Sequence, residues 1–109
     1  MKPECEHQDS EHSHVLRDDA LIDQVVAMAS AIGDRGRLRL LELLFDGPHC
    51  VSELAEESGD SMSAISQRLK ILHNAQLVSR KRDGKHVYYA LADDHVHTII
   101  EQLFVHSAE

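Results

Sequence analysis

The fold is decided by residues 51–74, VSELAEESGDSMSAISQRLKILHN. This stretch predicts a short helix over residues 53–58, which Val51 or Ser52 opens and Gly59 ends. A longer helix follows from about residue 62 to residue 74, capped by Ser61, and its inner side is predicted to consist of Ile65, Leu69, Ile71 and Leu72. Two helices joined by three or four residues that include a glycine are typical of a helix-turn-helix.

The second of these helices has the side chains that base recognition requires. Small and amide-bearing groups near its N-terminal end can approach base edges in a DNA groove, while arginine and lysine reach bases or phosphates. The candidate DNA-contacting residues of this helix are Ser63, Ala64, Ser66, Gln67, Arg68 and Lys70.

The residues that follow have a β-strand pattern. Residues 77–82 and 85–91 are two β-favouring runs around Asp83-Gly84, a dipeptide that is typical of hairpin turns. A basic hairpin after a helix-turn-helix indicates a wing that lies along the phosphate backbone. Taken alone, the hairpin fits equally well a strand edge that its charges keep soluble. The candidate wing contacts are Arg80, Lys81, Arg82 and Lys85.

The flanking segments complete one domain. We expect a helix over residues 19–33, another between Asp34 and the Asp46-Gly47-Pro48 stop, and a last helix over residues 93–109. Residues 1–18 are polar and rich in histidine, so we expect a mobile, metal-binding-capable tail before a domain over 19–109. The predicted fold class is mainly α with a small β-hairpin: a winged helix-turn-helix of about five helices and a two-stranded wing, paired as a homodimer.

Taken over the whole chain, the net charge of −8 argues against nucleic acid as a partner. The charge of each segment gives a different result. Residues 61–90 contain six basic residues and one acidic residue, which gives +5, whereas residues 1–60 sum to −9 and residues 91–109 to −4. A basic segment on an acidic chain is typical of a localised DNA-binding surface. The sequence has no apolar run of membrane-spanning length and no secretion signal, so we expect a cytoplasmic protein without a membrane partner.

The last predicted helix presents a metal-ligand pattern. His95 and His106 are eleven residues apart and share a face, but they lie about 16 Å apart along the axis. A zinc–nitrogen bond is only about 2.1 Å long, so one chain cannot bring both to one ion. Antiparallel pairing of two copies would bring Asp93 and His95 of one protomer to the partner's His106 and the partner's Glu109. Such ligands suit Zn²⁺ and also accept Co²⁺ or Ni²⁺. The alternative interpretation is that these histidines are surface residues of a dimerisation helix and bind no metal.

From about residue 20 to its end, the chain resembles the ArsR/SmtB family of dimeric winged-helix metalloregulators. The resemblance rests on DRGRLRLL (34–41), CVSELA (50–55), SAISQRL (63–69) and LVSRKRDGKHVYY (77–89). The last helix matches the zinc-sensing pattern of the family at Asp93, His95, His106 and Glu109. This resemblance implies a repressor that binds operator DNA, releases it when zinc binds, and controls genes of metal efflux or sequestration.

The resemblance also implies a second metal site and a coupling route. Cys50 and Glu53 match positions that some members combine with ligands from the N-terminal tail, which makes Cys5 and His7 the candidate partners, with His12 or His14 as substitutes for His7. Ser52 stands where the soft-metal version has a second cysteine, which weakens arsenic, lead and cadmium sensing. By similarity, His106 donates a hydrogen bond to the backbone carbonyl of Gln76.

Three other functions compete with the zinc sensor. The first is a winged-helix repressor that responds to another signal, either nickel or cobalt, or thiol redox chemistry through Cys5 and Cys50. A zinc buffer would not need the basic segment, and a zinc hydrolase would keep one coordination position open for water. We therefore expect no enzyme and no small organic substrate.

Overall fold

Capping side chains fix where the helices begin in the computed structural model, which describes residues 16–109. The carboxylates of Asp18, Asp34 and Asp93 and the hydroxyl of Ser61 each accept a hydrogen bond of 2.9–3.1 Å from the backbone N–H three residues further on. The helices that they cap are α2 (Asp19–Ile32), α3 (Arg35–Leu43), α6 (Asp94–Ala108) and α5 (Met62–Asn74).

Helix α4 (Val51–Ser58) begins in a different way. The backbone N–H of Cys50, just before the helix, donates to Glu53 Oε1 at 2.9 Å. The Glu53 carboxylate in the first turn thus fixes the backbone at the start of α4. Gly59 ends the helix with a φ of 78°, in the left-handed region that glycine adopts without steric cost.

A three-stranded antiparallel sheet contains the predicted hairpin. Strands β2 (Val78–Asp83) and β3 (His86–Leu91) form the wing, and β1 (His49–Cys50) pairs with the other edge of β3. The register places His49 opposite Tyr89 and Cys50 opposite Tyr88. Five helices and this sheet over residues 16–109 confirm the predicted winged helix-turn-helix, while β1, at two residues, is too short for any sequence pattern to reveal.

The core lies where α3, α4 and α5 meet under the sheet. Its fully buried side chains are Leu40, Leu41, Leu44, Leu54, Ile65, Leu69, Leu72 and Ile100. Residues 65, 69 and 72 of α5 follow the i, i+4, i+7 spacing of one helix face. The prediction that Ile71 shares this face is wrong: Ile71 is 39% exposed, because it lies about 240° around the helix from Ile65.

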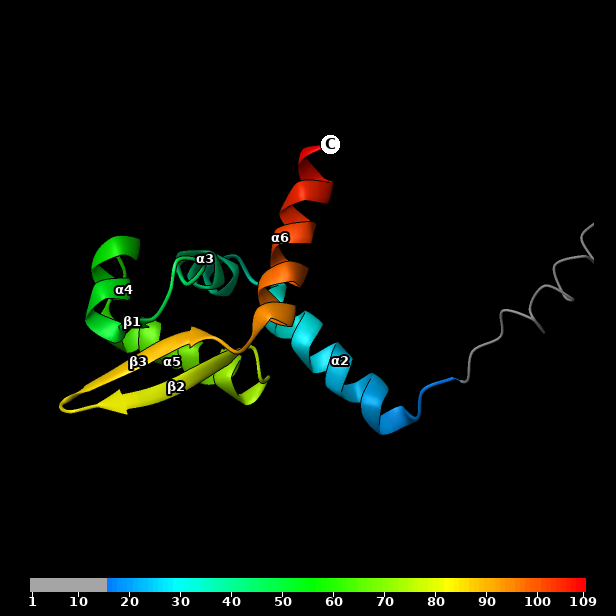
Figure 1. Ribbon diagram of the computed structural model, residues 1–109, viewed down its shortest axis with the longest axis horizontal. Coiled ribbons are helices and arrows are strands. Elements are labelled where there is room, and N and C mark those ends of the chain that lie inside the picture. Colours follow the sequence, from blue (N-terminus) through cyan, green and yellow to red (C-terminus); the bar gives the residue numbers. More distant parts are fainter. Residues whose placement is uncertain (1–15) are drawn as a thin grey trace, which may run out of the picture.

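Helices α2 and α6 lie on the side of the molecule opposite the tip of the wing (Figure 1). Helix α6 leaves the end of β3 and carries the C-terminus away from the other elements, and every residue from 101 to 109 is exposed. Between residues 16 and 109, the structure contains no helix both long and apolar enough to cross a membrane.

Candidate DNA interface and candidate metal sites

Helix α5 presents polar side chains to solvent on the side away from the core. Ser63, Ser66, Gln67 and Lys70 are exposed, and Ala64 is half-buried, with its backbone N–H donating to the Ser61 hydroxyl. The inner leucines fix the rotation of the helix, so its outer face is a preformed surface. Hydroxyl, amide and ammonium groups on one helix face can hydrogen-bond base edges and phosphates.

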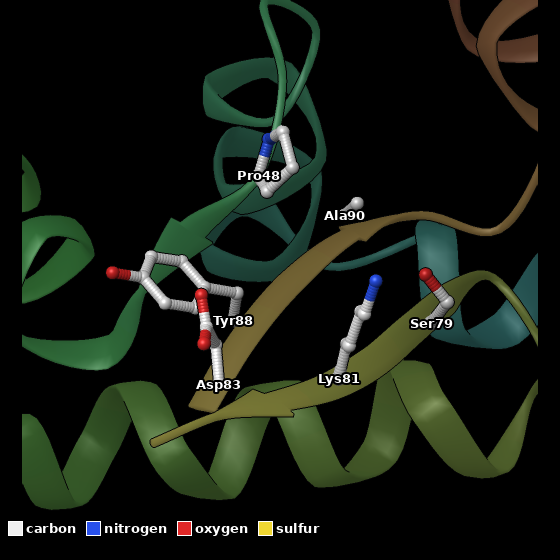
Figure 2. Close-up of a pocket in the computed structure, with 6 residues that line it drawn as sticks. All are labelled: Pro48, Ser79, Lys81, Asp83, Tyr88 and Ala90. Atoms are coloured by element: carbon white, nitrogen blue, oxygen red, sulfur yellow. The ribbon is translucent and has the colours of Figure 1, made fainter. Parts of the chain in front are cut away.

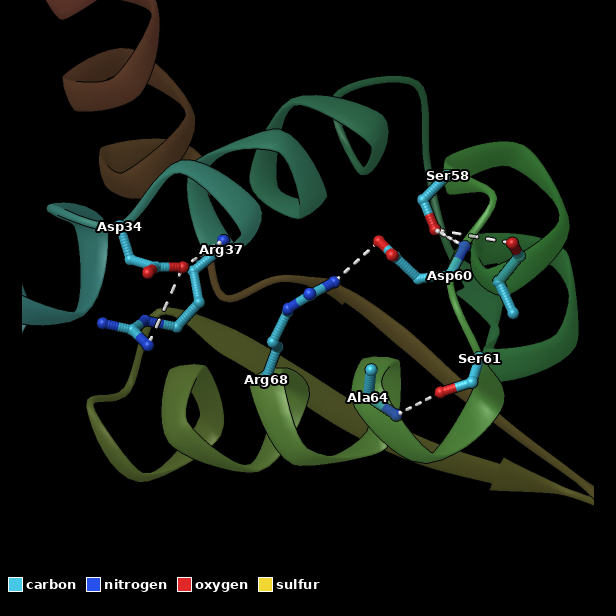
Figure 3. Close-up of polar contacts among 8 residues, drawn as sticks. Asp34, Arg37, Ser58, Asp60, Ser61, Ala64 and Arg68 are labelled. Atoms are coloured by element: carbon cyan, nitrogen blue, oxygen red, sulfur yellow. Dashed lines mark hydrogen bonds and ion pairs between the residues drawn. The ribbon is translucent and has the colours of Figure 1, made fainter.

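Arg68 differs from the other predicted α5 contacts. Its Nη1 lies 2.8 Å from Asp60 Oδ2 in the turn before the helix, and the side chain is only 29% exposed. Figure 3 shows the guanidinium reaching from α5 back toward this turn. Arg68 therefore forms an ion pair within the helix-turn-helix. The sequence pattern did not predict this contact.

The basic side chains of the wing divide between its two faces. Val78 is buried and pairs with Leu91, so Arg80 and Arg82, two and four residues further along β2, extend from the same face; we call it the inner face. Lys81 pairs with Tyr88 and extends from the outer face.

The outer face of the wing also forms an open groove of about 410 Å³. Figure 2 shows that Lys81 shares it with side chains from both strands and from Pro48; the lining residues are Pro48, Ser79, Lys81, Asp83, Tyr88 and Ala90. Lys85 instead follows Gly84, whose φ of 65° makes the tight turn at the tip. The four predicted wing contacts consequently point in different directions.

Two of the four predicted metal ligands on α6 are adjacent within one protomer. His95 Nδ1 lies 3.5 Å from Asp93 Oδ1, and both side chains are more than half exposed. The hydrogen bond from the Val96 backbone N–H to the Asp93 carboxylate lowers the pKa of Asp93, and the contact with His95 lowers it further. An ionised carboxylate beside an imidazole is half of a typical zinc site.

The other two predicted ligands lie at the opposite end of the same helix. His106 and Glu109 are exposed, in the last turn of α6 and at its C-cap. Within residues 16–109, no three histidine, cysteine or carboxylate side chains of one protomer gather closely enough to hold a metal ion. The complete four-ligand site needs a second protomer and stays a prediction.

His97 occupies another side of α6. Its ring packs against Phe45 with a centroid separation of 4.5 Å, and Nδ1 lies 3.8 Å from Glu101. Two residues span about 200° of a helix, so His97 lies on the other side of α6 from His95. His97 is therefore a histidine of the same helix whose contacts are with Phe45 and Glu101 and not with the predicted metal ligands.

The second predicted metal site is only partly within the described residues. Cys50 is half-buried with Sγ 3.2 Å from Ser52 Oγ, and the Glu53 carboxylate accepts from the Cys50 backbone. Cys5 and His7 lie outside the part of the chain that the structure describes, as do His12 and His14. The structure therefore shows that Cys50 and Glu53 are neighbours, and the tail ligands stay a prediction.

Sequence reasoning missed His49 beside this pair. His49 Nε2 lies 2.9 Å from Asp46 Oδ1, and Nδ1 lies 3.5 Å from Glu53 Oε1. The hydrogen bond with Asp46 raises the pKa of His49 and lowers the pKa of Asp46. The spacing of residues 46, 49 and 53 does not by itself predict that these side chains meet. Their contact depends on β1 and on the start of α4, which bring them together.

Gln76 has a backbone conformation that is unusual for its type. Its φ is 65°, and it is the only residue other than glycine with a positive φ between residues 16 and 109. Gln76 N–H donates to the His73 carbonyl and Leu77 N–H to the Leu72 carbonyl, both at 3.0 Å, which is the Schellman pattern at the end of α5. Over residues 16–109, no hydrogen bond joins His106 to Gln76, so the predicted coupling contact is absent within one protomer.

An apolar surface runs along α2 and α6. Val25 and Val26 on α2 and Ile99 and Leu103 on α6 are each about half exposed. A groove of about 440 Å³ lies between the two helices, lined by Val25, Met28, Ala29, Ile32, Gly33, Leu77, Val96, Ile99, Ile100 and Leu103. An apolar surface of this kind marks an interaction site.

The fold and the polar face of α5, followed by a basic hairpin, define a winged helix-turn-helix DNA-binding protein. Residues 34–80 match the family model described as "Bacterial regulatory protein, arsR family". The chain is 41% identical over 91 residues to the transcriptional repressor SmtB homolog of Synechocystis, covering 81% of this chain and 69% of that protein. The chain belongs to the arsR family of bacterial regulatory proteins.

Two further relatives agree with this assignment. The cadmium resistance transcriptional regulatory protein CadC homolog of Staphylococcus aureus is 31% identical over 86 residues, which are 78% of this chain and 71% of that protein. The homodimeric winged helix-turn-helix DNA-binding domain of Mb0332 from Mycobacterium bovis superposes with a TM-score of 0.83 and 30% identity, over 90% of this chain and 91% of that domain. The protein is thus a DNA-binding transcriptional regulator and not an enzyme, as the sequence predicts.

Proposed function

We propose that this protein is a homodimeric transcriptional repressor that binds operator DNA in the cytoplasm and releases it when Zn²⁺ binds. The observation that carries this proposal is the arrangement of α6. Asp93 and His95 lie 3.5 Å apart at one end of an exposed helix, and His106 and Glu109 are exposed at the other end. Antiparallel pairing of two such helices places one pair against the other.

The apolar surface of α2 and α6 supports the homodimer. Ile99 and Leu103 are about half exposed and lie close to the helix face that His95 and His106 share. Covering them with a second copy removes apolar area from water and brings the ligand pairs together in the same step. The Mycobacterium bovis domain, which superposes on this chain, is described as homodimeric.

The donor chemistry supports zinc as the signal. Two imidazole nitrogens and two carboxylate oxygens form a four-coordinate set that suits Zn²⁺, and Co²⁺ or Ni²⁺ would also bind it. Residues of both protomers would hold the ion, and its binding would therefore favour one dimer geometry. The set contains no thiolate, which disfavours soft ions such as Cd²⁺ in spite of the name of the Staphylococcus aureus relative.

The DNA contacts are proposed on the polar face of α5 and on the wing. Ser63, Ser66 and Gln67 near the N-terminal end of α5 would meet base edges, with Ala64 beside them, and Lys70 would meet a phosphate. On the wing, Arg80 and Arg82 of the inner face and Lys85 at the tip would add phosphate contacts, whereas Lys81 on the outer face would add only long-range attraction. Two copies of α5 must then match successive major grooves, about 34 Å apart.

Coupling between metal and DNA is proposed to pass from His106 to the end of α5. A metal-ligating imidazole usually donates its second N–H to a fixed acceptor. The Gln76 carbonyl is a suitable acceptor, since the Schellman hydrogen bonds hold this residue's backbone directly after α5. A shift at Gln76 would therefore turn α5 relative to its DNA groove. The controlled genes are proposed to serve metal efflux or sequestration.

Fluorescence anisotropy with the DNA upstream of the protein's own gene tests the proposal, first with chelator and then with zinc. We expect zinc to weaken DNA binding at least tenfold, which is about 1.4 kcal/mol. His106→Gln should bind DNA as before and lose the zinc response, whereas the matched control His97→Gln on the same helix should keep it. A response retained in His106→Gln would refute the α6 site. DNA binding that zinc leaves unchanged in the wild type would favour a thiol-redox or metal signal at Cys5 and Cys50.

A further inference from the structure

The helix-turn-helix contains one cation whose environment differs from that of a DNA-contacting residue. Arg68 Nη1 lies 2.8 Å from Asp60 Oδ2, and 71% of the side chain is covered, whereas Lys70, two residues further along α5 on another side of the helix, is exposed. Asp60 is itself held in the turn, since its backbone N–H donates to Ser58 Oγ at 3.3 Å. Figure 3 shows this chain of contacts from α5 through the turn to the end of α4.

The same guanidinium packs against α3. A Cβ placed on Gly36 would lie 2.9 Å from Arg68 Nε, a separation that Cβ atoms in proteins essentially never show, and a tight 3.1 Å from its Cζ. Gly36 therefore leaves room for the flat guanidinium on the surface of α3. A cavity of about 210 Å³ surrounds this contact, lined by Arg35, Gly36, Arg39, Leu40, Ser58, Asp60 and Arg68.

From these contacts, we infer that Arg68 is a positioning residue that locks the turn and α5 onto α3, and that it does not itself contact DNA. The inference rests on the proposed DNA-binding function. One planar group joins three parts of the motif: α5, which carries it; the turn, which supplies Asp60; and α3, which supplies the surface at Gly36. Fixing α5 before DNA arrives lowers the ordering cost of the complex.

The salt dependence of DNA binding distinguishes a positioning residue from a phosphate contact. Loss of one phosphate contact lowers the slope of log K against log salt concentration by about 0.9. We expect Arg68→Gln to weaken operator binding about fivefold, the size of one exposed ion pair, with the slope unchanged. A slope lowered by about one in Arg68→Gln would overturn the inference.

The variant Asp60→Asn should change the affinity for DNA in opposite directions, depending on whether Arg68 positions α5 or contacts a phosphate. If Arg68 positions α5, removing the Asp60 charge weakens DNA binding by about the same factor, and the double variant is no weaker than Arg68→Gln alone. If Arg68 contacts a phosphate, the same change frees Arg68 and removes a negative charge near DNA, so binding tightens. Unchanged or tighter binding by Asp60→Asn would overturn the inference.

Gly36→Ala separates positioning from general loss of structure. Gly36 lies in the first turn of α3 without a positive φ, and alanine is a better helix former than glycine, so far-UV circular dichroism should show full helix content, while the added Cβ displaces the guanidinium. We expect weaker DNA binding in the wild-type background and no further weakening in the Arg68→Gln background; additive losses would overturn the inference. A wild-type protein without salt-dependent DNA binding would instead refute the proposed function, and the inference with it.

Discussion

His95 Nδ1 lies 3.5 Å from Asp93 Oδ1 in the first turn of α6, and the same oxygen accepts the hydrogen bond of the Val96 backbone N–H. Asp93 thus starts the helix and orients the imidazole beside it. The Asp93 side chain is 56% exposed, so the same carboxylate is also accessible to a metal ion. One carboxylate can therefore serve the fold and the metal at the same time.

Asp93→Asn should separate these two roles. Asparagine caps helices as well as aspartate does, so α6 and the affinity for DNA without zinc should be unchanged. The anionic ligand is lost, and we expect zinc affinity to fall by at least about tenfold, measured by competition with a chromophoric chelator. Wild-type zinc affinity in this variant would remove Asp93 from the site.

The pair of His49 and Asp46 should make the stability of the protein depend on pH. The hydrogen bond with Asp46 raises the pKa of His49 above its usual 6.5, so the charged imidazole stabilises the folded state. This contribution is complete below pH 6.5 and is lost as the pH rises through the raised pKa. It also needs an ionised Asp46, whose pKa is lowered from 3.8.

Urea unfolding of the wild type and His49→Gln measures this contribution. With chelator present and at one protomer concentration, the difference in the free energy of unfolding should be largest near pH 6 and should shrink toward pH 8.5. Glutamine can still donate to Asp46 but carries no charge, so the difference reports the charge alone. A difference that is constant over this range would contradict the assignment.

Gln76→Gly should stabilise the protein. A residue with a side chain pays a conformational cost at a φ of 65°, and glycine does not. We expect the free energy of unfolding to rise by about 1 kcal/mol, offset in part by the greater freedom of glycine in the unfolded chain. Thermal unfolding would show a higher melting temperature. A lower one would mean that the Gln76 side chain makes contacts that outweigh the strain.

The two faces of the wing should contribute differently to DNA binding. Arg80 and Arg82 extend from the inner face, which packs toward α5, and Lys81 extends from the outer face. We expect Arg80→Gln to weaken binding and to lower the salt slope by about 0.9, and Lys81→Gln to leave the slope unchanged. Both variants remove one positive charge, so net charge is matched. Equal slopes in the two variants would show that the wing acts only through its total charge.

Much of the fold was predictable from the sequence because its signals are local. Asp34, Ser61 and Asp93 cap helices where the sequence places them, and Asp83-Gly84 makes the hairpin turn. The first strand was not predictable, because two residues carry no alternation and β1 exists only through its pairing with β3.

The candidate sites were less predictable because they depend on contacts between elements. Residue type alone predicts that Arg68 contacts DNA. Its neighbours Asp60 and Gly36 come close to it only when α3 packs on the turn, which the sequence does not show. The prediction that Ile71 faces the core was wrong for a related reason. An apolar residue is buried only if its angular position on the helix places it on the core-facing side. The α6 quartet could be proposed from the sequence because its spacing is a property of a single helix, and the shared site that it would form stays a prediction.

A mixed dimer tests the central claim, that the metal site is shared between protomers, most directly. His95→Gln and His106→Gln homodimers should each lack every complete site. In a purified dimer with one protomer of each kind, one site loses both histidines, and the other combines an intact His95 with the partner's His106. Chelator competition should therefore find one zinc ion bound with wild-type affinity per mixed dimer. If the mixed dimer binds zinc no better than the two homodimers, the shared site on α6 is contradicted.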